Sequence, residues 1–416
     1  MPSDPRKPYI VVCNHQSLVD IPIICCLSWD MKWLAKEELF KTPFLGTMMK
    51  ASKDIPVQRD SKRGRLQALV QAIKTLEGRS SVMLFPEGTR SPDGKVYGFM
   101  DGIFSIAMDR KVDILPLAID GSIRILKILT TTVAKIPLPV QMIIAVFRSV
   151  KRKKEWTRDR YSSRLNELTK IQSSKLYELL RKGGHQVDVL PAYYFTPPYL
   201  DYIFPKLRSK YQKWIVVPML PIEAEFSCGI ACKMAINEFK EDAFKSILVL
   251  KHFWNDDKLA DIMVNKIVNA PIGKGACGLI LSVHGTLVKD YKGNEPALNT
   301  GHKATLDFFH KLKKRIEEHE KNTFSSIKLG ALNHKFGGTW MPETIERAFE
   351  ELSKEGIDHV SLFPFGFFTD NSESDYEAKR MLEKSDFKSK QYISCLNDDD
   401  NFIEWLAERI RQKLQF

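Results

Sequence analysis

Residues 9–20 have the sequence YIVVCNHQSLVD, in which the apolar run Tyr9–Cys13 leads directly into a polar segment that contains His15 and Asp20. A short, continuous apolar run is typical of a strand that is buried on both faces, as in a parallel sheet. The polar segment should then leave the sheet at the carboxyl end of the strand, where open α/β sheets bind ligands. This stretch therefore predicts an α/β fold with a site around residue 15.

The following residues continue an alternation of strands and helices. Val82–Phe85 and Ile114–Ile119 are further apolar runs, and Gly64–Glu77 has the spacing of an amphipathic helix. Strands that alternate with helices usually form a parallel sheet with helices packed on it. We therefore expect an α/β sandwich in the first part of the chain.

The alternation of strands and helices stops after residue 150. Residues 151–182 open with Lys-Arg-Lys-Lys and continue as a charged helical pattern that stops at Gly183-Gly184. A second alternation begins at Val187, with strands expected at Trp214–Val217, Gly278–Val283, Ile327–Ala331 and Val360–Phe363. The pattern predicts two domains: residues 1–182, which end in the basic helical segment, and residues 187–416.

The composition suits two globular domains. The 416 residues are 44% hydrophobic and 27% charged, which excludes a largely disordered chain, and the seven Cys lack the regular spacing of a disulfide framework. The net charge of +12 is by itself compatible with nucleic acid, anionic lipid or phosphorylated substrates. The basic run 151–154 is equally compatible with lipid contact or with a solvated helix face.

The distribution of apolar residues along the chain predicts where the protein lies in the cell. Residues 2–8 are polar, so we expect no signal peptide, and the most apolar stretch, residues 123–147, is interrupted by two Lys and two Pro. We expect a cytoplasmic protein that associates peripherally with the inner or cytoplasmic-facing membrane. We expect no nucleic-acid partner.

His15 and Asp20 form the first candidate site. The five-residue spacing lets the carboxylate return to the imidazole if the chain turns helical after His15. Such a pair fixes the tautomer and stabilises the imidazolium, so His15 would accept the proton of a hydroxyl that attacks an acyl thioester, without a nucleophilic Ser. The spacing alone is a weak signal and is also typical of a surface His and a helix-capping Asp.

Residues 85–91, with the sequence FPEGTRS, form a second motif after an expected strand. Arg90 is suited to hold a phosphate by two hydrogen bonds, and Gly88 permits close approach of the backbone. Glu87 is placed to orient Arg90 or a substrate hydroxyl. A polar turn without a ligand is the alternative interpretation.

The two motifs together resemble the phospholipid/glycerol acyltransferase family in order and spacing. Residues 54–59 (DIPVQR) and 114–117 (ILPL) match two further blocks of that family, and the resemblance covers about residues 8–150. It implies a 1-acylglycerol-3-phosphate acyltransferase without a cofactor, which transfers an acyl group from acyl-CoA or acyl-carrier protein to a lysophospholipid or glycerol-phosphate hydroxyl. It implies His15 as general base, Asp20 as its orienting partner, and acceptor binding by Arg59, Glu87, Gly88, Thr89 and Arg90. The family's Phe-Lys-x-Gly block is Phe-Met-Asp-Gly here, at residues 99–102, and lacks the lysine.

His284 and Glu373 form the candidate site of the second domain. His284 ends the apolar run 279–283, and Glu373 lies in the polar segment 366–374 that follows another expected strand. An imidazole and a carboxylate suit both a borderline metal such as iron and proton abstraction from an NH group. A capped turn is the alternative for each of them.

This domain resembles ferrochelatase. The matching blocks are SVHG at 282–285, GNEP at 293–296, KFGGTWMP at 335–342 and GFFTDNSESDYE at 366–377, and the resemblance covers about residues 187–416. It implies Rossmann-like halves around a porphyrin cleft and the insertion of ferrous iron, as a substrate, into protoporphyrin. His284 and Glu373 would then be the metal-binding and proton-abstracting pair.

The second domain also departs from that family. The opening strand has no counterpart, so we expect a domain that is truncated at its start, and Ile222, Glu223 and Ala224 replace residues that would face the porphyrin. Three functions stay open: two working enzymes, an acyltransferase with a non-catalytic porphyrin-binding, metal-binding or scaffold domain, and a ferrochelatase with a degenerate acyltransferase half.

Overall fold

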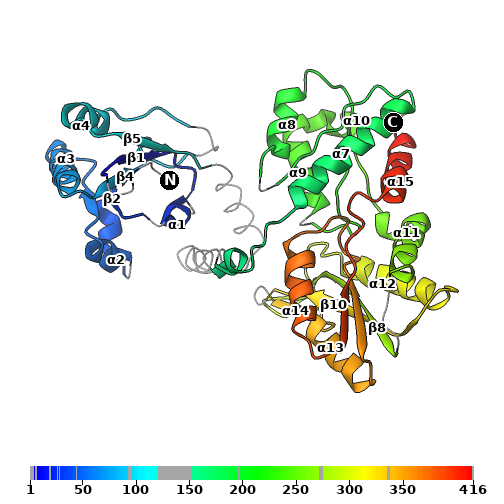
Figure 1. The fold of residues 1–416 in the computed structure, drawn as a ribbon. Coiled ribbons are helices and arrows are strands. Elements are labelled where there is room, and N and C mark those ends of the chain that lie inside the picture. The colour runs from blue at the N-terminus through cyan, green and yellow to red at the C-terminus, as the bar shows by residue number, and fades with distance from the viewer. Residues whose placement is uncertain are drawn as a thin grey trace. The chain divides into compact units, whose positions relative to one another are not determined.

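The computed structural model describes residues 4, 7–17, 20–25, 27, 29–43, 45–91, 96–119, 151–152, 154–194, 196–225, 227–270, 275–334 and 338–414. The chain divides into two compact units, Met1–Glu155 and Trp156–Phe416, and each has its own sheet (Figure 1). The apolar stretch 123–147 lies outside the described residues, as do Leu18, Val19 and residues 335–337 of the sequence motifs.

Unit 1 is built on a parallel five-stranded sheet. Its strands are β1 (Ile10–Cys13), β2 (Met31–Lys36), β3 (Ile55–Val57), β4 (Ser81–Leu84) and β5 (Ile114–Leu117), in the order β3-β2-β4-β1-β5. All four residues of β1 and of β4 are buried. The apolar runs therefore predicted the α/β fold and its parallel sheet correctly.

Helices cover both faces of this sheet. They are α1 (Asp20–Cys25), α2 (Leu45–Ala51), α3 (Lys62–Glu77) and α4 (Gly102–Arg110), with the 3-10 helix η1 at Glu37–Lys41. Successive residues of a strand point to opposite faces. Ile10 and Val12 accordingly join the core formed with α3 and α4, and Val11 joins a second core with Ile24 of α1. β1 is thus buried on both faces, and its carboxyl end opens at residue 14.

Unit 2 contains a parallel four-stranded sheet. Its strands are β8 (Cys277–His284), β10 (Phe324–Leu332), β12 (His359–Phe363) and β13 (Ser389–Tyr392), in the order β10-β8-β12-β13. From β8 the chain passes to β10 on one side and then returns to β12 on the other. Open α/β sheets bind ligands at the carboxyl ends of strands where the chain changes direction in this way.

Two smaller sheets complete unit 2. β6 (Trp214–Val216) pairs with β7 (Ile247–Val249) in parallel, and β9 (Leu287–Asp290) pairs with β11 (Gly338–Trp340) in an antiparallel ribbon. Among the described residues, the part of unit 2 before β8 therefore holds one two-stranded sheet beside the four-stranded sheet of the second part.

Helices also cover both faces of the larger sheet. The helices of unit 2 are α7 (Leu165–Lys182), α8 (Leu200–Leu207), α9 (Cys228–Phe239), α10 (Ala243–Ser246), α11 (Asp257–Val268), α12 (His302–Glu317), α13 (Ile345–Lys354), α14 (Lys379–Glu383) and α15 (Asp400–Arg411), with the 3-10 helices η2 (Lys240–Asp242) and η3 (Phe253–Asn255) and the π-helix η4 (Ser372–Ala378). The main core lies between the sheet and α7, α11, α12 and α15, and a smaller core lies beneath α13 and α14 (Figure 1).

Helix α7 corrects the domain boundary that the sequence pattern indicates at residue 182. Its residues Leu176 and Leu180 are 5% and 1% exposed and belong to the main core of unit 2, where α7 packs on α15. Gln172, also buried, donates to Thr369 Oγ1 at 2.9 Å. The apolar stripe predicted the helix but not its partner, because α15 lies more than two hundred residues further along the chain.

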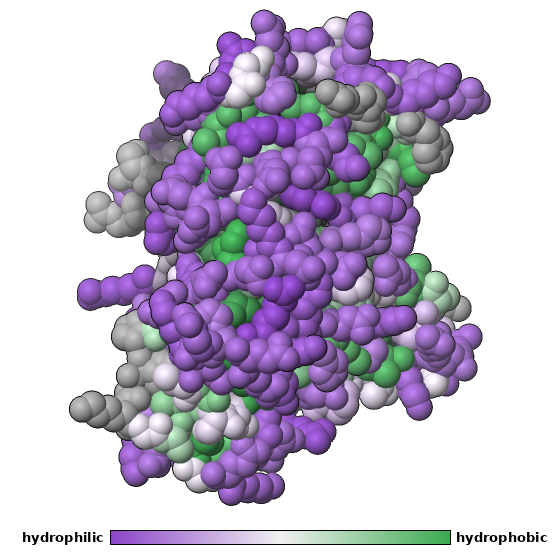
Figure 2. Space-filling view, turned by 90° about the vertical axis from the view of Figure 1, so that its right-hand side faces the viewer, coloured by the Kyte–Doolittle hydropathy of each residue, from purple (hydrophilic) through white to green (hydrophobic). Residues whose placement is uncertain are grey.

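The surface is mainly polar. Figure 2 shows a face on which hydrophilic residues dominate and hydrophobic residues form small patches. Within the ranges that the structure describes, no helix combines the length and the apolarity needed to cross a membrane.

The packing of α7 generates a test of the boundary. We expect residues 156–416 to fold as an isolated fragment and residues 183–416 to be largely unfolded. Loss of α7 removes the buried Leu168, Leu176 and Leu180, each worth about 1.5–3 kcal/mol, against a typical total stability of about 5–15 kcal/mol. Circular dichroism and urea unfolding of the two fragments measure this. Equal stability of both fragments would place the boundary after α7.

Candidate active sites

The His15–Asp20 pair lies at the carboxyl end of β1. His15 Nδ1 is 2.8 Å from Asp20 Oδ2, and the side chains are 13% and 0% exposed. The same oxygen accepts the backbone N–H groups of Gln16 at 2.6 Å and Ser17 at 2.9 Å. A neutral imidazole that donates from Nδ1 keeps its lone pair on Nε2. The spacing therefore produces the expected dyad, with Nε2 as the atom available to accept a proton.

The imidazole and its loop are held by neighbouring loops of the sheet. The His15 ring stacks on Phe85, directly after β4, with ring centroids 3.8 Å apart and an interplanar angle of 11°. Asn14 donates from Nδ2 to Ile119 O at 2.7 Å, and its Oδ1 accepts Ile119 N–H at 2.8 Å. The loops after three adjacent strands thus fix the position of His15.

Glu87 connects two loops at the carboxyl end of the sheet. It is buried, its Oε1 accepts the backbone N–H of His15 at 2.8 Å, and its Oε2 accepts that of Tyr97 at 3.0 Å. The motif predicts that Glu87 orients Arg90 or a substrate hydroxyl. Its backbone partners instead give it a bridging position that ties the loop after β4 to the His15 loop.

Gly88, Thr89, Arg90 and Arg59 surround this bridge. Gly88 has φ of +69°, and a Cβ there would lie 2.5 Å from Met100 Cε, so the turn requires glycine. Arg59 Nη1 donates to Gly88 O, which brings these two predicted residues together. Thr89 and Arg90 are exposed beside Ser91, whose N–H donates to His15 O at 2.7 Å. Two exposed guanidinium groups therefore lie on loops at the same end of the sheet as His15.

His284 and Glu373 meet at the carboxyl edge of the four-stranded sheet in unit 2. His284 is the last residue of β8, and its Nδ1 lies 2.8 Å from Glu373 Oε2. Glu373 stands in the first turn of η4, where Asn371 Oδ1 accepts its backbone N–H at 2.9 Å and Asn371 N–H donates to Ser374 Oγ at 2.9 Å. π-Helical turns are rare and frequently occur at functional sites. The structure brings the two predicted residues together.

Charge and neighbouring rings define the surroundings of His284. Burial lowers its pKa, but the hydrogen bond to Glu373 and the charges of Glu373 and Glu377 raise it more, so its pKa lies above the usual value. The rings of His334 and Trp340 lie 5.0 and 6.3 Å away, measured between centroids. The described residues contain no cluster of three or more His, Cys, Asp or Glu side chains arranged to bind a metal.

Asp370 occupies a separate position, although it lies in the same sequence block as Glu373. It is buried, and its carboxylate accepts from Tyr392 Oη at 2.8 Å, Cys395 N–H at 3.0 Å and Asn397 Nδ2 at 2.8 Å. These contacts hold the loop after β12 against the chain before α15. Asp370 therefore supports the segment that leads to η4.

The acidic residues that replace the family's porphyrin-facing block are already paired. Glu223 accepts from His252 N–H and from Trp254 Nε1, the latter at 3.1 Å, and Glu225 pairs with Lys233 at 2.6 Å. The hydrogen-bond and ion-pair partners of both carboxylates therefore lie within unit 2.

His334 is the candidate residue that the sequence analysis does not single out. It follows β10, the neighbour of β8, by two residues, and its ring packs on Trp340 with centroids 5.1 Å apart. A second His just beyond the carboxyl end of a buried strand was the available signal. The sequence motifs do not indicate His334, because it directly precedes the KFGGTWMP block and belongs to none of the matching motifs.

Two family models match the chain. The model described as Acyltransferase matches residues 2–120, and the model described as Ferrochelatase matches residues 125–414. The second match covers more than half of the chain. It begins before residue 187, the start that the motifs indicate, and includes α7.

The chain is also similar to individual acyltransferases and to a ferrochelatase. A 1-acyl-sn-glycerol-3-phosphate acyltransferase of Chlamydomonas reinhardtii is 36% identical over 118 residues, 28% of this chain and 36% of that protein. A ferrochelatase of Helicobacter pylori is 24% identical over 228 residues, 52% of this chain and 65% of that protein. The solved acyltransferase PlsC of Thermotoga maritima is 37% identical, with 28% of this chain and 44% of that chain covered and a TM-score of 0.23. The chain spans about a third of the length of the curated acyltransferases that it matches first.

The raised pKa of His284 generates a prediction. Because the pKa of His284 is raised in the folded state, protonation of His284 stabilises the fold. This stabilisation is fully present at low pH and is lost as the pH rises through the raised pKa. In Glu373→Gln the main raising contributions disappear and burial remains, so the pKa of His284 should fall below that of the wild type. NMR titration of the imidazole measures this. An unchanged pKa would show that Glu373 does not control the protonation of His284.

Proposed function

Because the chain belongs to the ferrochelatase family and carries an acyltransferase domain ahead of its ferrochelatase domain, we propose that it catalyses two reactions, one at each imidazole–carboxylate pair. The first is acyl transfer to the hydroxyl of a lysophospholipid or glycerol phosphate. The second is insertion of ferrous iron into protoporphyrin. The observation that carries the first is the 2.8 Å contact between His15 Nδ1 and the buried Asp20 carboxylate.

In the proposed acyl transfer, His15 acts as a general base. Nε2 accepts the proton of the acceptor hydroxyl while its oxygen attacks the thioester carbonyl of acyl-CoA or acyl-carrier protein. The tetrahedral intermediate collapses with cleavage of the carbon–sulfur bond, and the imidazolium returns the proton to the thiolate. The Asp20 carboxylate holds the Nδ1–H tautomer and stabilises the imidazolium between the two steps. No cofactor is required.

Arg59 and Arg90 are the groups proposed to hold the acceptor's phosphate. Both side chains are exposed at the end of the sheet that carries His15, and a guanidinium offers two parallel donors to phosphate oxygens. Gly88 shapes the turn between them, with its carbonyl oxygen bound by Arg59. Thr89 adds an exposed hydroxyl, and Glu87 would act by fixing the loop.

Membrane contact is proposed from the substrates and the charge. A lysophospholipid and protoporphyrin both partition into lipid, and the chain carries a net charge of +12. A basic protein binds anionic membrane surfaces peripherally. We propose association with a cytoplasmic-facing membrane surface, where both substrates are available.

In the proposed chelatase reaction, His284 and Glu373 handle the protons and the incoming iron. Insertion of one Fe²⁺ releases two pyrrole protons, and in this proposal the pair at the carboxyl end of β8 accepts them; the 2.8 Å contact between His284 Nδ1 and Glu373 Oε2 supports it. A neutral imidazole accepts protons or binds Fe²⁺, whereas an imidazolium does neither. Since the pKa of His284 is raised, the rate should increase as the pH passes upward through that value.

A domain that binds porphyrin without inserting iron is the second candidate for unit 2. Two observations favour it: the two-stranded sheet β6–β7 among the described residues before β8, and the 24% identity to a ferrochelatase. Porphyrin binding in the absence of insertion separates this candidate from the chelatase.

We predict that His15→Ala lowers kcat for acylation of a lysophospholipid by roughly 10²–10⁴-fold, the usual contribution of a general base. Asp20→Asn should also lower kcat because it alters the tautomer. Acyl transfer is measured with a radiolabelled acyl donor, and the exposed His310 provides the control His310→Ala. Full activity in a folded His15→Ala protein would exclude this mechanism.

Arg90→Ala should raise KM for the phosphate-bearing acceptor more than KM for the acyl donor. A charge-assisted hydrogen bond contributes about 1.5–3 kcal/mol, equivalent to a rise of roughly 10-fold or more. Arg63→Ala, at another exposed arginine, is the matched control. Equal changes in both KM values would assign Arg90 a structural role.

His284→Ala should abolish insertion of ferrous iron into protoporphyrin, because the pair at the carboxyl end of β8 loses its base. Insertion is followed by the change in porphyrin absorbance, and porphyrin binding by fluorescence quenching. The proposal requires insertion by the wild type and by His310→Ala. Binding without insertion in the wild type would instead identify a binding domain.

A further inference from the structure

A short segment at the start of unit 2 is bound to the helix that carries Glu373. Tyr161 Oη donates to Asp375 Oδ1 at 2.6 Å, and Tyr376 Oη donates to Asp159 Oδ2 at 2.8 Å. The two bonds are reciprocal, because each side supplies one phenol and one carboxylate. Arg380 adds an ion pair with Asp159 at 3.5 Å. Asp159 and Tyr161, together with Trp156, are called the clasp below.

Aromatic rings also pack against one another at the contact between the clasp and η4. The rings of Tyr161 and Tyr376 have centroids 4.6 Å apart, and Trp156 lies 5.0 Å from Tyr161 and 6.3 Å from Tyr376. Aromatic pairs at such distances are favourable. The hydrogen bonds to Arg158 and Tyr376 lower the pKa of Asp159, so its carboxylate is ionised at neutral pH and accepts strongly.

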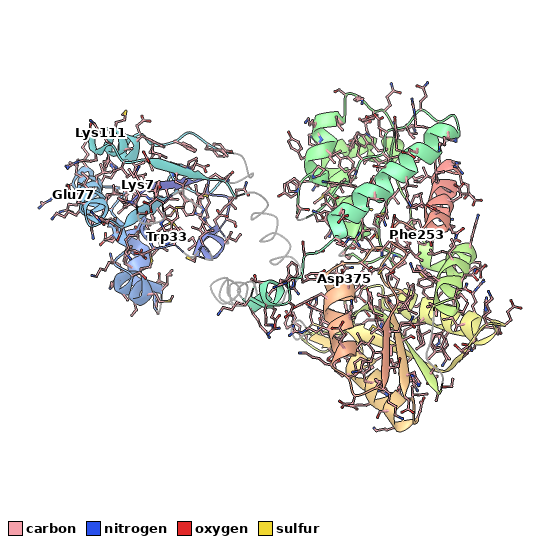
Figure 3. The ribbon with its side chains drawn as sticks, in the orientation of Figure 1. Lys7, Trp33, Glu77, Lys111, Phe253 and Asp375 are labelled. Atoms are coloured by element: carbon pink, nitrogen blue, oxygen red, sulfur yellow. The ribbon has the colours of Figure 1, made fainter. Side chains whose placement is uncertain are left out.

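The contact lies on the turns that position Glu373. Asp375 and Tyr376 follow Glu373 by two and three residues on η4, and Figure 3 shows Asp375 where the chain that leads into α7 passes this helix. A π-helix is rare in proteins and occurs frequently at functional sites. The Asn371 capping box holds the beginning of η4, and the clasp holds its middle.

We propose that the clasp is a positioning element of the second site: it holds η4 so that Glu373 stays in hydrogen-bond reach of His284. The clasp contacts Asp375 and Tyr376 of η4 and Arg380 just beyond it, so it acts on Glu373 through the helix. The clasp consists of the first residues of unit 2, so this segment contributes to the geometry of the chelatase site. The inference deepens the proposed iron insertion and rests on it for its kinetic consequence.

The test compares the full-length wild type with Tyr161→Phe, which removes one oxygen atom, and with Asp159→Ala and Asp159→Glu. Tyr202→Phe, at an exposed tyrosine of α8, is the matched control. Hydrogen exchange is measured for peptides spanning residues 372–378 and, separately, for β8 and β10. Insertion of ferrous iron into protoporphyrin gives kcat and KM.

The proposal expects faster exchange in residues 372–378 of Tyr161→Phe and Asp159→Ala, with β8 and β10 unchanged. It also expects kcat to fall by roughly 10- to 100-fold with little change in KM, since a displacement of about 1 Å costs up to about 10²-fold. Asp159→Glu should recover part of the loss. Unchanged exchange in 372–378, or a loss of protection throughout the sheet, would overturn it. If the wild type inserts no iron, the chelatase proposal fails, and the exchange data still decide whether the clasp holds η4.

Discussion

The hydrogen bond between an imidazole and a carboxylate, placed at the carboxyl end of a buried parallel strand, is the interaction on which both units depend. His15 stands just after β1 and His284 at the end of β8, and each Nδ1 lies 2.8 Å from its carboxylate. A strand buried on both faces cannot move sideways, so it delivers the histidine to a fixed place. The carboxylate then fixes the tautomer and leaves Nε2 for chemistry.

The two pairs differ in how the carboxylate is held, and the difference matches the proposed reactions. Asp20 is fully buried and binds two backbone amides of its own loop, so its position depends on neighbouring residues. Glu373 is partly exposed and stands on a π-helix held by the clasp, far away in the sequence. An imidazolium stabilised by a rigid carboxylate suits a base that returns its proton. A more open pair suits an exchange of protons and iron with a large planar substrate.

Much of this was predictable because the decisive signals are local. Continuous apolar runs identified the strands β1 and β8, and the polar residues after them identified the histidines. The partners of several other side chains were not predictable, since they lie far apart in the sequence. The packing of α7 on α15, the bridging role of Glu87 and the contact of Tyr161 with Asp375 appear only in three dimensions. The contact of Glu223 with Trp254, thirty-one residues away, is a further example.

The central claim is that one chain holds two independent sites of the same design. The most direct measurement assays acyl transfer and iron insertion side by side in the full-length wild type, Asp20→Asn, Glu373→Gln and the double variant. Our account predicts that the wild type performs both reactions, that each single variant loses only the reaction of its own unit, and that the double variant loses both. A wild type with only one activity, or a single variant that impairs both reactions equally, would contradict it.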